Sequence, residues 1–380
     1  MKIVIAIDSF KGSLSSYKAG EAVKNGIKRV FEDAEIIVRP LADGGEGTVE
    51  ALTEGLSGKI TFTEVSGPLG EKVIAIYGIA GDTAIMEISQ AAGLTLVPQN
   101  RRNPLYTTTY GVGEMIKDAI NKGIRHFIIG IGGSATNDGG VGMLQALGFG
   151  FFDEDNNPVP RGADGLRVLK RITDDNAMPQ LKECTFGIAC DVSNPLCGAL
   201  GASRIYGPQK GADEEMTGKM DSWLYEYAEL TKKLYPDADA SYPGAGAAGG
   251  LGFAFMSFLG GSLKKGSELI LSETKLSNYL ENADFVITGE GRLDSQSVMG
   301  KAPVGVAALA KEKNIPVLAF SGCATPDAGI CNQYGVDAFF PILREPVTLE
   351  EAMEPEYTYR NLSDTTEQVF RVIKIFNKKV

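Results

Sequence analysis

The sequence predicts an α/β protein of two domains: a Rossmann- or flavodoxin-like domain with a mainly parallel sheet, and a second α/β domain with a mixed sheet inserted into it. Near both ends of the chain, short apolar runs alternate with amphipathic segments, as in parallel strands joined by crossover helices. Residues 60–89 instead hold short alternating segments separated by turns, which is typical of antiparallel or mixed sheet. The 380 residues, 43% hydrophobic and 22% charged, suffice for two globular domains.

The change of pattern near residue 60 sets the expected boundaries. We expect residues 1–64 and 281–380 to form the first domain and residues 65–280 the inserted one. Part of the segment 107–147 could belong to the first domain, because no linker or low-complexity stretch marks the border.

Composition excludes several classes of function. The net charge of -11 and the lack of a basic run argue against nucleic acid or an anionic membrane as partner. No apolar run reaches membrane-spanning length, and the apolar start before Asp8 is too short for a signal peptide, so we expect a cytoplasmic protein. The five cysteines are odd in number and lack a C-x2-C spacing, which favours reduced structural thiols.

The chain has a single histidine, His126, which follows Arg125 at the start of a predicted strand. We expect it to be structural. General-base chemistry then falls to carboxylates or lysine.

The chain begins with a buried strand at residues 2–7 that ends on Asp8 and leads into a helix capped by Ser15 or Ser16. Asp8 and Lys11 thus follow the carboxyl end of a strand, where ligands bind in open parallel sheets. A turn residue and a solvated charge are the alternatives. The next elements are a strand at residues 34–41, the acid–glycine segment around Asp43 that opens a second helix, and a helix at residues 107–122.

A strand at residues 127–131, a tight glycine-rich loop and a helix at residues 141–147 form the central motif of the chain. Backbone amides and small polar side chains at a helix N-terminus suit an anion. A glycine-rich turn without a ligand is the alternative. The candidate anion-binding residues are Gly132, Gly133, Ser134, Asn137 and Asp138.

Further along, residues 151–160 predict a hairpin, and a strand within residues 186–198 ends in Asp191 and Asn194. Lys210 then lies in a glycine-containing loop, from which a lysine can reach a phosphate. Solvated surface is the alternative for this side chain.

The segment GAGAAG at residues 244–249 formally matches the G-x-G-x-x-G dinucleotide motif. That interpretation requires a strand directly before the glycines, and Pro243 stands there instead. We expect a small-residue loop that opens an apolar helix at residues 251–259.

The last third of the chain returns to the α/β pattern. A strand at residues 283–288 leads to Glu290, Arg292 and Asp294, and Lys301 begins a helix with a proline near its start. The remaining elements are strands at residues 315–322 and 337–342 and a helix at residues 366–377.

Carboxylates, glycine loops and cations recur at the strand ends. Carboxylates can hold Mg²⁺ through water, loop amides can bind phosphate oxygens, and lysine or arginine can neutralise a transferring phosphoryl group. Phosphoryl transfer from a nucleotide needs all three. The P-loop and protein-kinase motifs are absent, so the sequence indicates a separate kind of small-molecule kinase.

Six motifs carry a family resemblance over almost the whole chain. In order, they are IVIAIDSFKGSLSS, PLADGGEGT, GIGGSATNDGG, ACDVSNPLCG with GPQKGA, GAGAAGGLGFAF, and VITGEGRLDSQSVMGK. Together they resemble the bacterial type-1 glycerate kinases. The resemblance implies ATP-dependent phosphorylation of D-glycerate, commonly to 2-phosphoglycerate, with the active site in the cleft between two α/β domains. One departure is Ser297, where we expect threonine, and the hydroxyl is retained.

Carried onto the matching positions, the resemblance implies a set of cleft residues whose roles we assign by chemistry. We expect Asp191 to be the general base on the glycerate hydroxyl. Lys11 and Arg292 would contact the transferring phosphate or the substrate carboxylate, and Glu290 and Asp294 would hold Mg²⁺. The expected ATP-binding residues are Asp8, Gly132, Gly133, Ser134, Asn137, Asp138 and Lys301, and the expected glycerate-binding residues are Asp43, Asn194 and Lys210.

Two alternatives from other classes stay open. An NAD(P)-dependent oxidoreductase of a small hydroxy acid rests on GAGAAG alone, and a non-catalytic sensor of a sugar acid or nucleotide would use the same cleft without turnover. Neither explains why so many strands end in carboxylate–glycine loops. The product, 2- or 3-phosphoglycerate, the domain that binds ATP, and whether the chain forms a homo-oligomer are undecided at this stage.

Overall fold

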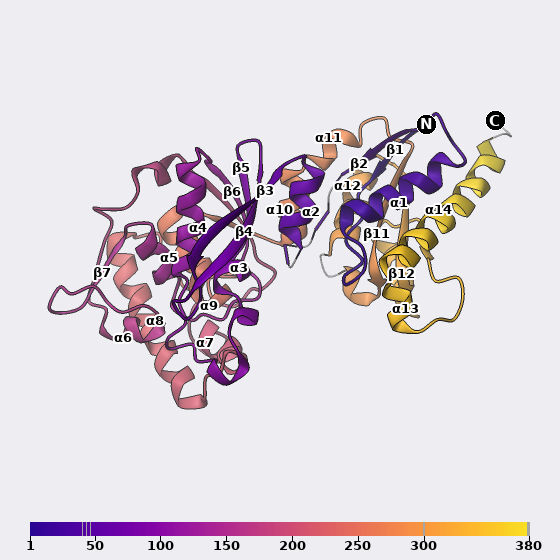
Figure 1. Ribbon diagram of the computed structural model, residues 1–380. Helices are drawn as coiled ribbons and strands as arrows, with labels where there is room; N and C mark the ends of the chain where they lie inside the picture. Colours follow the sequence, from indigo (N-terminus) through magenta and orange to yellow (C-terminus); the bar gives the residue numbers. More distant parts are fainter. Residues whose placement is uncertain (40, 43, 46, 299–300, 378–380) are drawn as a thin grey trace. The chain divides into compact units, whose positions relative to one another are not determined.

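The computed structural model describes residues 1–39, 41–42, 44–45, 47–298 and 301–377, in which the chain forms two compact units (Figure 1). Unit 1 comprises Met1–Asp43, Glu50–Gly58 and Ser267–Val380, and unit 2 comprises Gly44–Val49 and Lys59–Gly266. Asp43, which we expected to bind glycerate, lies outside the described residues.

Unit 1 contains a parallel sheet, and the strand order of this sheet matters for function. The described strands have the order β13-β12-β11-β1-β2, and every neighbouring pair is parallel. Counted by their occurrence within the unit, this is the flavodoxin-like order 2-1-3-4-5, which reverses between β1 and β11. Ligands bind at the carboxyl ends of the strands beside such a switch point. The strands are β1 (Lys2–Ile5), β2 (Glu35–Val38), β11 (Phe285–Leu293), β12 (Val317–Ala324) and β13 (Ala338–Pro341).

Both faces of this sheet are covered by helices, which explains its continuous apolar strands. On β1, Ile3 and Ile5 belong to the core under α1 and α14, whereas Val4 belongs to the core under α10, α11 and α12. Figure 1 shows α1 and α14 side by side, and Phe370 of α14 packs edge-on against Phe31, which follows α1, at 6.3 Å between ring centroids. The layers place the strand ends, and not the strand faces, within reach of a ligand.

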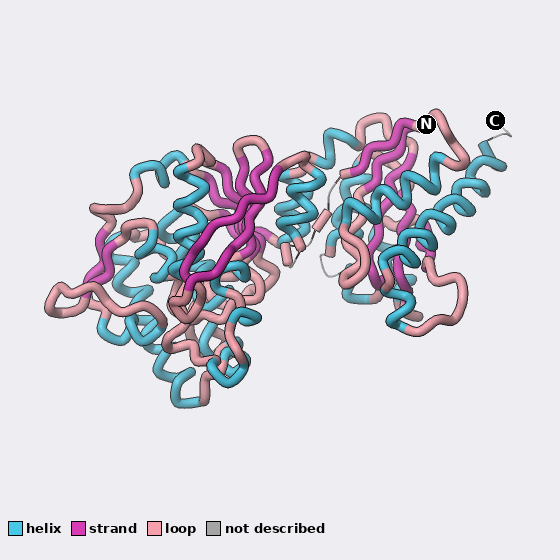
Figure 2. The backbone as a smooth tube through the Cα atoms, in the orientation of Figure 1, coloured by secondary structure: helices cyan, strands magenta, loops and turns pink. Residues whose placement is uncertain are grey.

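Unit 2 contains the expected mixed sheet (Figure 2). Its order is β10-β9-β6-β5-β4-β3; the pairs from β10 to β5 are parallel, and β5–β4 and β4–β3 are antiparallel. Together with the parallel sheet of unit 1, this confirms the predicted fold class. The strands are β3 (Lys59–Ser66), β4 (Lys72–Ala80), β5 (Thr83–Glu87), β6 (His126–Gly130), β9 (Thr185–Ala189) and β10 (Ser262–Lys264).

The core of unit 2 is built from aromatic side chains. Phe127 of β6 stacks on Phe186 of β9 with ring centroids 4.9 Å apart, and Phe255 of α9 lies 6.0 Å from Phe186. The first predicted boundary, after residue 64, would cut through β3. Because β3 pairs with β4 along its whole length, it lies entirely in unit 2.

Two local predictions differ in part from the structure. The hairpin expected at 151–160 is short: the Asp153 amide donates to the Asn157 carbonyl at 2.9 Å, the Val159 amide donates to the Phe151 carbonyl at 3.0 Å, and Phe152 bridges Pro158. The regular pairing of β7 (Gly150–Phe152) is with β8 (Arg171–Thr173). The prolines in that segment lack the N–H donors that a strand needs. The C-terminal helix α14 begins earlier than expected, at a proline, which the first helical turn accepts. In α9, Ala248, Gly249 and Gly250 have left-handed backbone angles, so its continuous part begins after residue 250, as predicted.

The helices complete the architecture, and none of those formed by the described residues is long and apolar enough to cross a bilayer. Ser15, not Ser16, caps α1, because its hydroxyl accepts a hydrogen bond from the Lys18 amide. The α-helices are α1 (Ser16–Lys28), α2 (Thr48–Gly55), α3 (Ser89–Ala92), α4 (Tyr110–Asn121), α5 (Val141–Ala146), α6 (Ala163–Val168), α7 (Ala202–Tyr206), α8 (Glu214–Leu234), α9 (Ala247–Leu259), α10 (Gly266–Glu273), α11 (Leu276–Tyr279), α12 (Ala302–Glu312), α13 (Leu349–Met353) and α14 (Pro355–Asn377).

Candidate active site

Two pockets, each within one unit, contain most of the residues expected at the active site. The switch-point pocket of unit 1 has a volume of about 600 Å³, and the glycine-loop pocket of unit 2 has a volume of about 310 Å³. Among the expected residues, the switch-point pocket is lined by Asp8, Lys11, Glu290, Arg292, Asp294 and Lys301, and the glycine-loop pocket by Gly132, Gly133, Ser134, Asp191 and Lys210.

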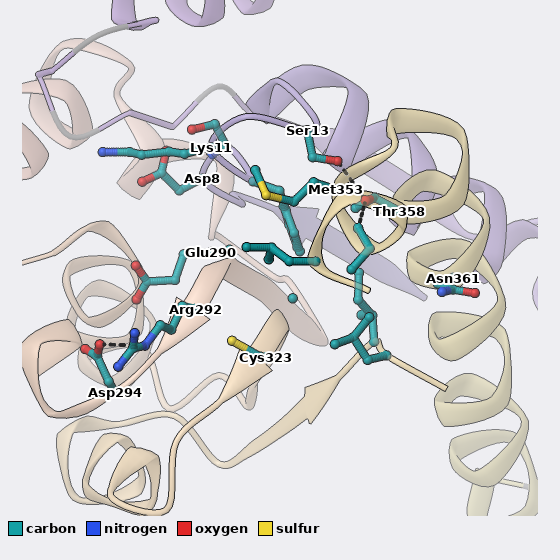
Figure 3. Close-up of a pocket in the computed structure, with 18 of the residues that line it drawn as sticks. Asp8, Lys11, Ser13, Glu290, Arg292, Asp294, Cys323, Met353, Thr358 and Asn361 are labelled. Carbon is teal, nitrogen blue, oxygen red and sulfur yellow. Dashed lines mark hydrogen bonds and ion pairs between the residues drawn. The ribbon is translucent and has the colours of Figure 1, made fainter. Parts of the chain in front are cut away.

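The switch-point pocket lies where the sheet topology predicts a ligand. Beyond β1 the chain stays beside β11, since the Asp8 amide donates to the Gly289 carbonyl at 2.9 Å. Glycine is required at 289, because a Cβ there would lie 1.9 Å from the Phe320 carbonyl oxygen. Asp8 and Glu290 are therefore brought to the same edge of the sheet, as Figure 3 shows with Lys11 beside them.

Two carboxylates of this pocket share one lysine. Glu290 is 7% exposed and accepts a hydrogen bond from the Ser297 hydroxyl at 2.5 Å. Lys301 Nζ lies 3.4 Å from Glu290 and 4.0 Å from Asp294, and Arg292 Nε lies 3.2 Å from Asp294. Burial raises the pKa of Glu290, while the Ser297 hydroxyl and Lys301 oppose that shift.

The donor set of this pocket fits Mg²⁺ in one particular way. Among the described residues, no three acidic, cysteine or histidine side chains form a ready-made metal cluster. Mg²⁺ commonly takes only one or two carboxylates and completes its shell with water and substrate phosphates. Glu290 and Asp294 therefore suit an ion that arrives with a phosphate, and not an ion caged by protein alone.

Part of the lining of the switch-point pocket is apolar and was not predicted from the sequence. Phe10, Leu349 and Met353 line the pocket, together with Tyr357 and Asn361 of α14. These side chains come mostly from helices, and hydrophobic periodicity alone does not separate a pocket wall from a core contact.

The glycine-loop pocket is organised around a buried lysine. Lys210 is 2% exposed, and its Nζ donates to Ser134 Oγ at 2.8 Å and to the Thr136 carbonyl at 2.7 Å. Burial lowers the pKa of Lys210 to about 7, although the charge of Asp138 opposes the shift. The alternative of a solvated surface lysine is therefore wrong. Gly211 closes the turn with φ of 98°, where a Cβ would lie 2.2 Å from the Arg102 carbonyl.

Asn137 and Asp138 are buried and fix the conformation of the glycine-rich loop through hydrogen bonds. Asp138 is fully buried and accepts hydrogen bonds from the Thr109 amide at 2.8 Å, the Thr109 hydroxyl at 2.9 Å and the Gly140 amide at 3.1 Å. Burial raises its pKa, and these hydrogen bonds oppose the rise. Asn137 donates to the Ser203 hydroxyl at 2.8 Å. Neither side chain lines either pocket.

Asp191 and Asn194, which follow β9, have different surroundings. Asp191 is exposed, lines the glycine-loop pocket and accepts a hydrogen bond from the Gly266 amide at 2.9 Å. Asn194 donates to the Leu200 carbonyl at 2.8 Å and accepts from the Tyr206 hydroxyl at 2.6 Å, so it holds its own loop in place, and it lines neither of the two pockets. Tyr206 does line the pocket and was missed.

Of the residues proposed to be structural, His126 lies away from both pockets. It is exposed, with Nδ1 2.7 Å from the Thr185 hydroxyl. All five cysteines are free; Cys323 lines the switch-point pocket and Cys190 lines the glycine-loop pocket. The GAGAAG segment follows a turn, not a strand, and leads into α9, so the geometry of a dinucleotide fingerprint is not present there.

A flavodoxin-like switch point with carboxylates and cations, and a glycine loop with a buried lysine, are the parts that phosphoryl transfer to a small molecule requires. The fold and the two pockets thus define a small-molecule kinase. The model of the glycerate kinase family matches residues 3–374, and the chain belongs to that family.

Individual relatives agree with this assignment. The chain is 48% identical over 359 residues to the glycerate 2-kinase of Escherichia coli K12, and the match covers 94% of both chains. It is 45% identical to the glycerate kinase of Bacillus subtilis 168, covering 96% of each chain. A solved crystal structure from Salmonella typhimurium LT2, described provisionally as glycerate kinase 2, superposes with a TM-score of 0.92 at 44% identity, covering 100% of this chain and 99% of that one.

Proposed function

We propose that the protein transfers the γ-phosphoryl group of ATP to D-glycerate in a Mg²⁺-dependent reaction that yields 2-phosphoglycerate. The observation that carries the proposal is the grouping of three carboxylates and three cations at the switch point, in a chain of the glycerate kinase family. The choice of the 2-phosphate follows the name of the Escherichia coli relative.

Glycerate is assigned to the glycine-loop pocket. Its volume of about 310 Å³ is at the small end for ligand sites, which suits a three-carbon acid better than a nucleotide. The ammonium of Lys210 is the partner for the glycerate carboxylate, with Ser134 and the amides of Gly132 and Gly133 as further donors. This assignment moves these three loop residues from the expected ATP contacts to the glycerate contacts.

Asp191 is the proposed general base. Among the described residues, it is the carboxylate that lines the same pocket as Lys210, and the only histidine of the chain lies in neither pocket. As the glycerate oxygen forms its bond to the γ-phosphorus, the bond from that phosphorus to the ADP oxygen breaks. The hydroxyl proton passes to the Asp191 carboxylate.

The switch-point pocket is assigned to the phosphates of ATP. Lys11, Arg292 and Lys301 would neutralise charge on the phosphoryl group, and Glu290 and Asp294 would hold Mg²⁺. When bound there, Mg²⁺ would polarise the phosphate oxygens and neutralise their developing charge. The placement of the reaction in a cleft between the two domains stays a prediction.

Phosphorus NMR of a reaction with ATP, D-glycerate and Mg²⁺ tests this function, because it identifies the product as well as counting it. We expect a 2-phosphoglycerate signal that grows with ADP and needs all three components. A 3-phosphoglycerate signal would correct the position of transfer. No ester above the background of ATP hydrolysis would remove glycerate as the substrate.

A further inference from the structure

A buried asparagine of the switch-point pocket lacks a hydrogen-bond partner. Asn361 of α14 lines the pocket and is 4% exposed, and its Nδ2 donates to no atom of the described structure. The hydroxyl of Tyr357, which lines the same pocket one turn earlier, is also buried and unpartnered. Unpaired buried polar groups destabilise a fold, so two on one pocket wall indicate that a ligand completes the pairing.

The wall near Asn361 is apolar although it faces an open pocket. Leu349, Leu343 and Met353 line the pocket and are 76%, 42% and 37% exposed, and the buried Phe10 lines it too. Large apolar side chains gathered at a hollow in the surface mark a binding site, and methionine adapts its shape to flat rings. In Figure 3, Asn361 and Asp294 lie on opposite sides of the drawn pocket, so one end is apolar and the other charged.

We propose that the apolar end of the switch-point pocket binds the adenine base of the nucleotide, with the Asn361 amide hydrogen-bonded to the edge of the base. An asparagine amide presents a donor and an acceptor side by side, and these match the N7 acceptor and N6 amino donor of adenine. A volume of about 600 Å³ is within the range of cofactor sites. Base and phosphates then occupy opposite ends of one pocket.

This inference rests on the proposed function, because it names where that reaction holds its nucleotide. It also answers the question of which domain binds ATP, and it assigns a role to α13 and α14, which carry none of the expected site residues. The base would be selected by a helix residue, whereas the phosphates would be held by residues at the carboxyl end of β11 and in the neighbouring loops.

Calorimetric titration of the full-length protein with ADP and with inosine diphosphate, without glycerate, tests the base site. Inosine carries an oxygen where adenine carries the N6 amino group, so the wild-type protein is expected to prefer ADP. Asn361→Leu should weaken ADP binding by about tenfold and abolish the preference over inosine diphosphate. The unfolding midpoint of this variant should stay the same or rise, because an unpaired buried amide has been removed.

Two further variants keep the test decisive. Ser363→Ala is the matched control: Ser363 is also buried on α14 with an unpartnered hydroxyl, but it lines neither the switch-point nor the glycine-loop pocket, so its ADP affinity should equal that of the wild type. Leu349→Ser alters an exposed side chain that folding does not require, and it should weaken both nucleotides about equally.

The outcomes separate this inference from the proposed function. Wild-type ADP affinity in both Asn361→Leu and Leu349→Ser, or no base preference in the wild type, would overturn the base site even if glycerate is phosphorylated. ADP binding that depends on Asn361 in a protein that does not phosphorylate glycerate would leave the base site standing and remove glycerate as the acceptor.

Discussion

The two pockets hold their cations in opposite ways. Lys210 of the glycine-loop pocket is 2% exposed and donates to two fixed oxygen atoms. The Lys301 and Arg292 side chains of the switch-point pocket are 39% and 63% exposed and pair with carboxylates. A buried charge acts strongly on a ligand because little water screens it, whereas exposed pairs are weak and exchange partners easily. The difference suggests one rigid site for a single small anion, and one adaptable site whose internal ion pairs open as a charged phosphate chain binds.

Asp191→Asn sharpens the comparison, because it tests whether the rigid pocket supplies the general base as well as the binding site for glycerate. Without a carboxylate to accept the hydroxyl proton, kcat should fall by about 10²- to 10⁴-fold while the KM for glycerate changes little. Initial rates of ADP formation measure both constants. Asp82→Asn, in which the native side chain is 76% exposed and lies outside the pocket, is the control and should behave as wild type. A variant at 191 that keeps most of its kcat removes the base assignment.

The adaptable pocket is tested by Glu290→Gln, which removes one charge but preserves the hydrogen bond to Ser297. Loss of a carboxylate that holds Mg²⁺ at the transferring phosphate should lower kcat by about 10²- to 10³-fold. The Mg²⁺ concentration for half-maximal activity should rise at the same time. Glu32→Gln, an exposed site in the same unit, is the control. An unchanged Mg²⁺ dependence would transfer the metal role to another carboxylate.

Lys210→Met tests the difference between the two pockets, because only the KM for glycerate, and not the KM for ATP, should change. Loss of the ammonium should raise the KM for glycerate by about 10- to 100-fold, the usual range for one charged hydrogen-bonded contact. The KM for ATP should stay constant, as measured by varying each substrate in turn. Lys219→Met, a mostly exposed lysine of the same unit, is the control. A rise in the KM for ATP instead would assign ATP to the glycine-loop pocket and glycerate to the switch-point pocket.

The sequence predicted the strand ends well and the helix faces poorly. Asp8 and Glu290 were recognised because an acid directly after a buried apolar run must lie at the carboxyl edge of a parallel sheet. The reversal of strand order that brings them together could not be recognised, since it depends on pairing between residues that are far apart in the chain. Asn361 gave no local signal, because the pocket that it faces is formed by other segments.

The loop residues show a second limit. Ser134 and Asp138 stand four residues apart in one polar, glycine-rich segment, and both were predicted from the sequence to contact a ligand. Of these two residues, only Ser134 lines the pocket. The Asp138 carboxylate is buried and accepts hydrogen bonds from the Thr109 amide and hydroxyl. The side chain of Asn194 likewise accepts a hydrogen bond from the Tyr206 hydroxyl and does not face a ligand site. Hydrogen-bond partners that are distant in the sequence determine which polar side chain faces a ligand. The composition of a loop does not reveal those partners.

The smallest expected effect is a pH dependence that belongs to the rigid pocket alone. Burial lowers the pKa of Lys210 to about 7, so its ammonium deprotonates above that pH and attracts the ionised glycerate less. The kcat/KM for glycerate should fall about tenfold per pH unit above pH 7, and this limb should be absent in Lys210→Met. Cys190 and Tyr206, which line the same pocket, do not explain such a limb, because burial raises the pKa values of both groups further above 7.

The ligand-free protein gives an independent check on the same group. In the unfolded chain the lysine regains its ordinary pKa of 10.5, so between pH 7 and 10.5 the unfolded state binds one more proton than the folded state. The free energy of unfolding of the wild type, relative to Lys210→Met, should therefore rise with pH in the range where glycerate binding weakens. If the free energy of unfolding rises with pH while kcat/KM for glycerate falls, deprotonation of the same buried ammonium accounts for both changes. Parallel slopes, measured by chemical denaturation and steady-state kinetics, would place the titrating group outside the glycine-loop pocket.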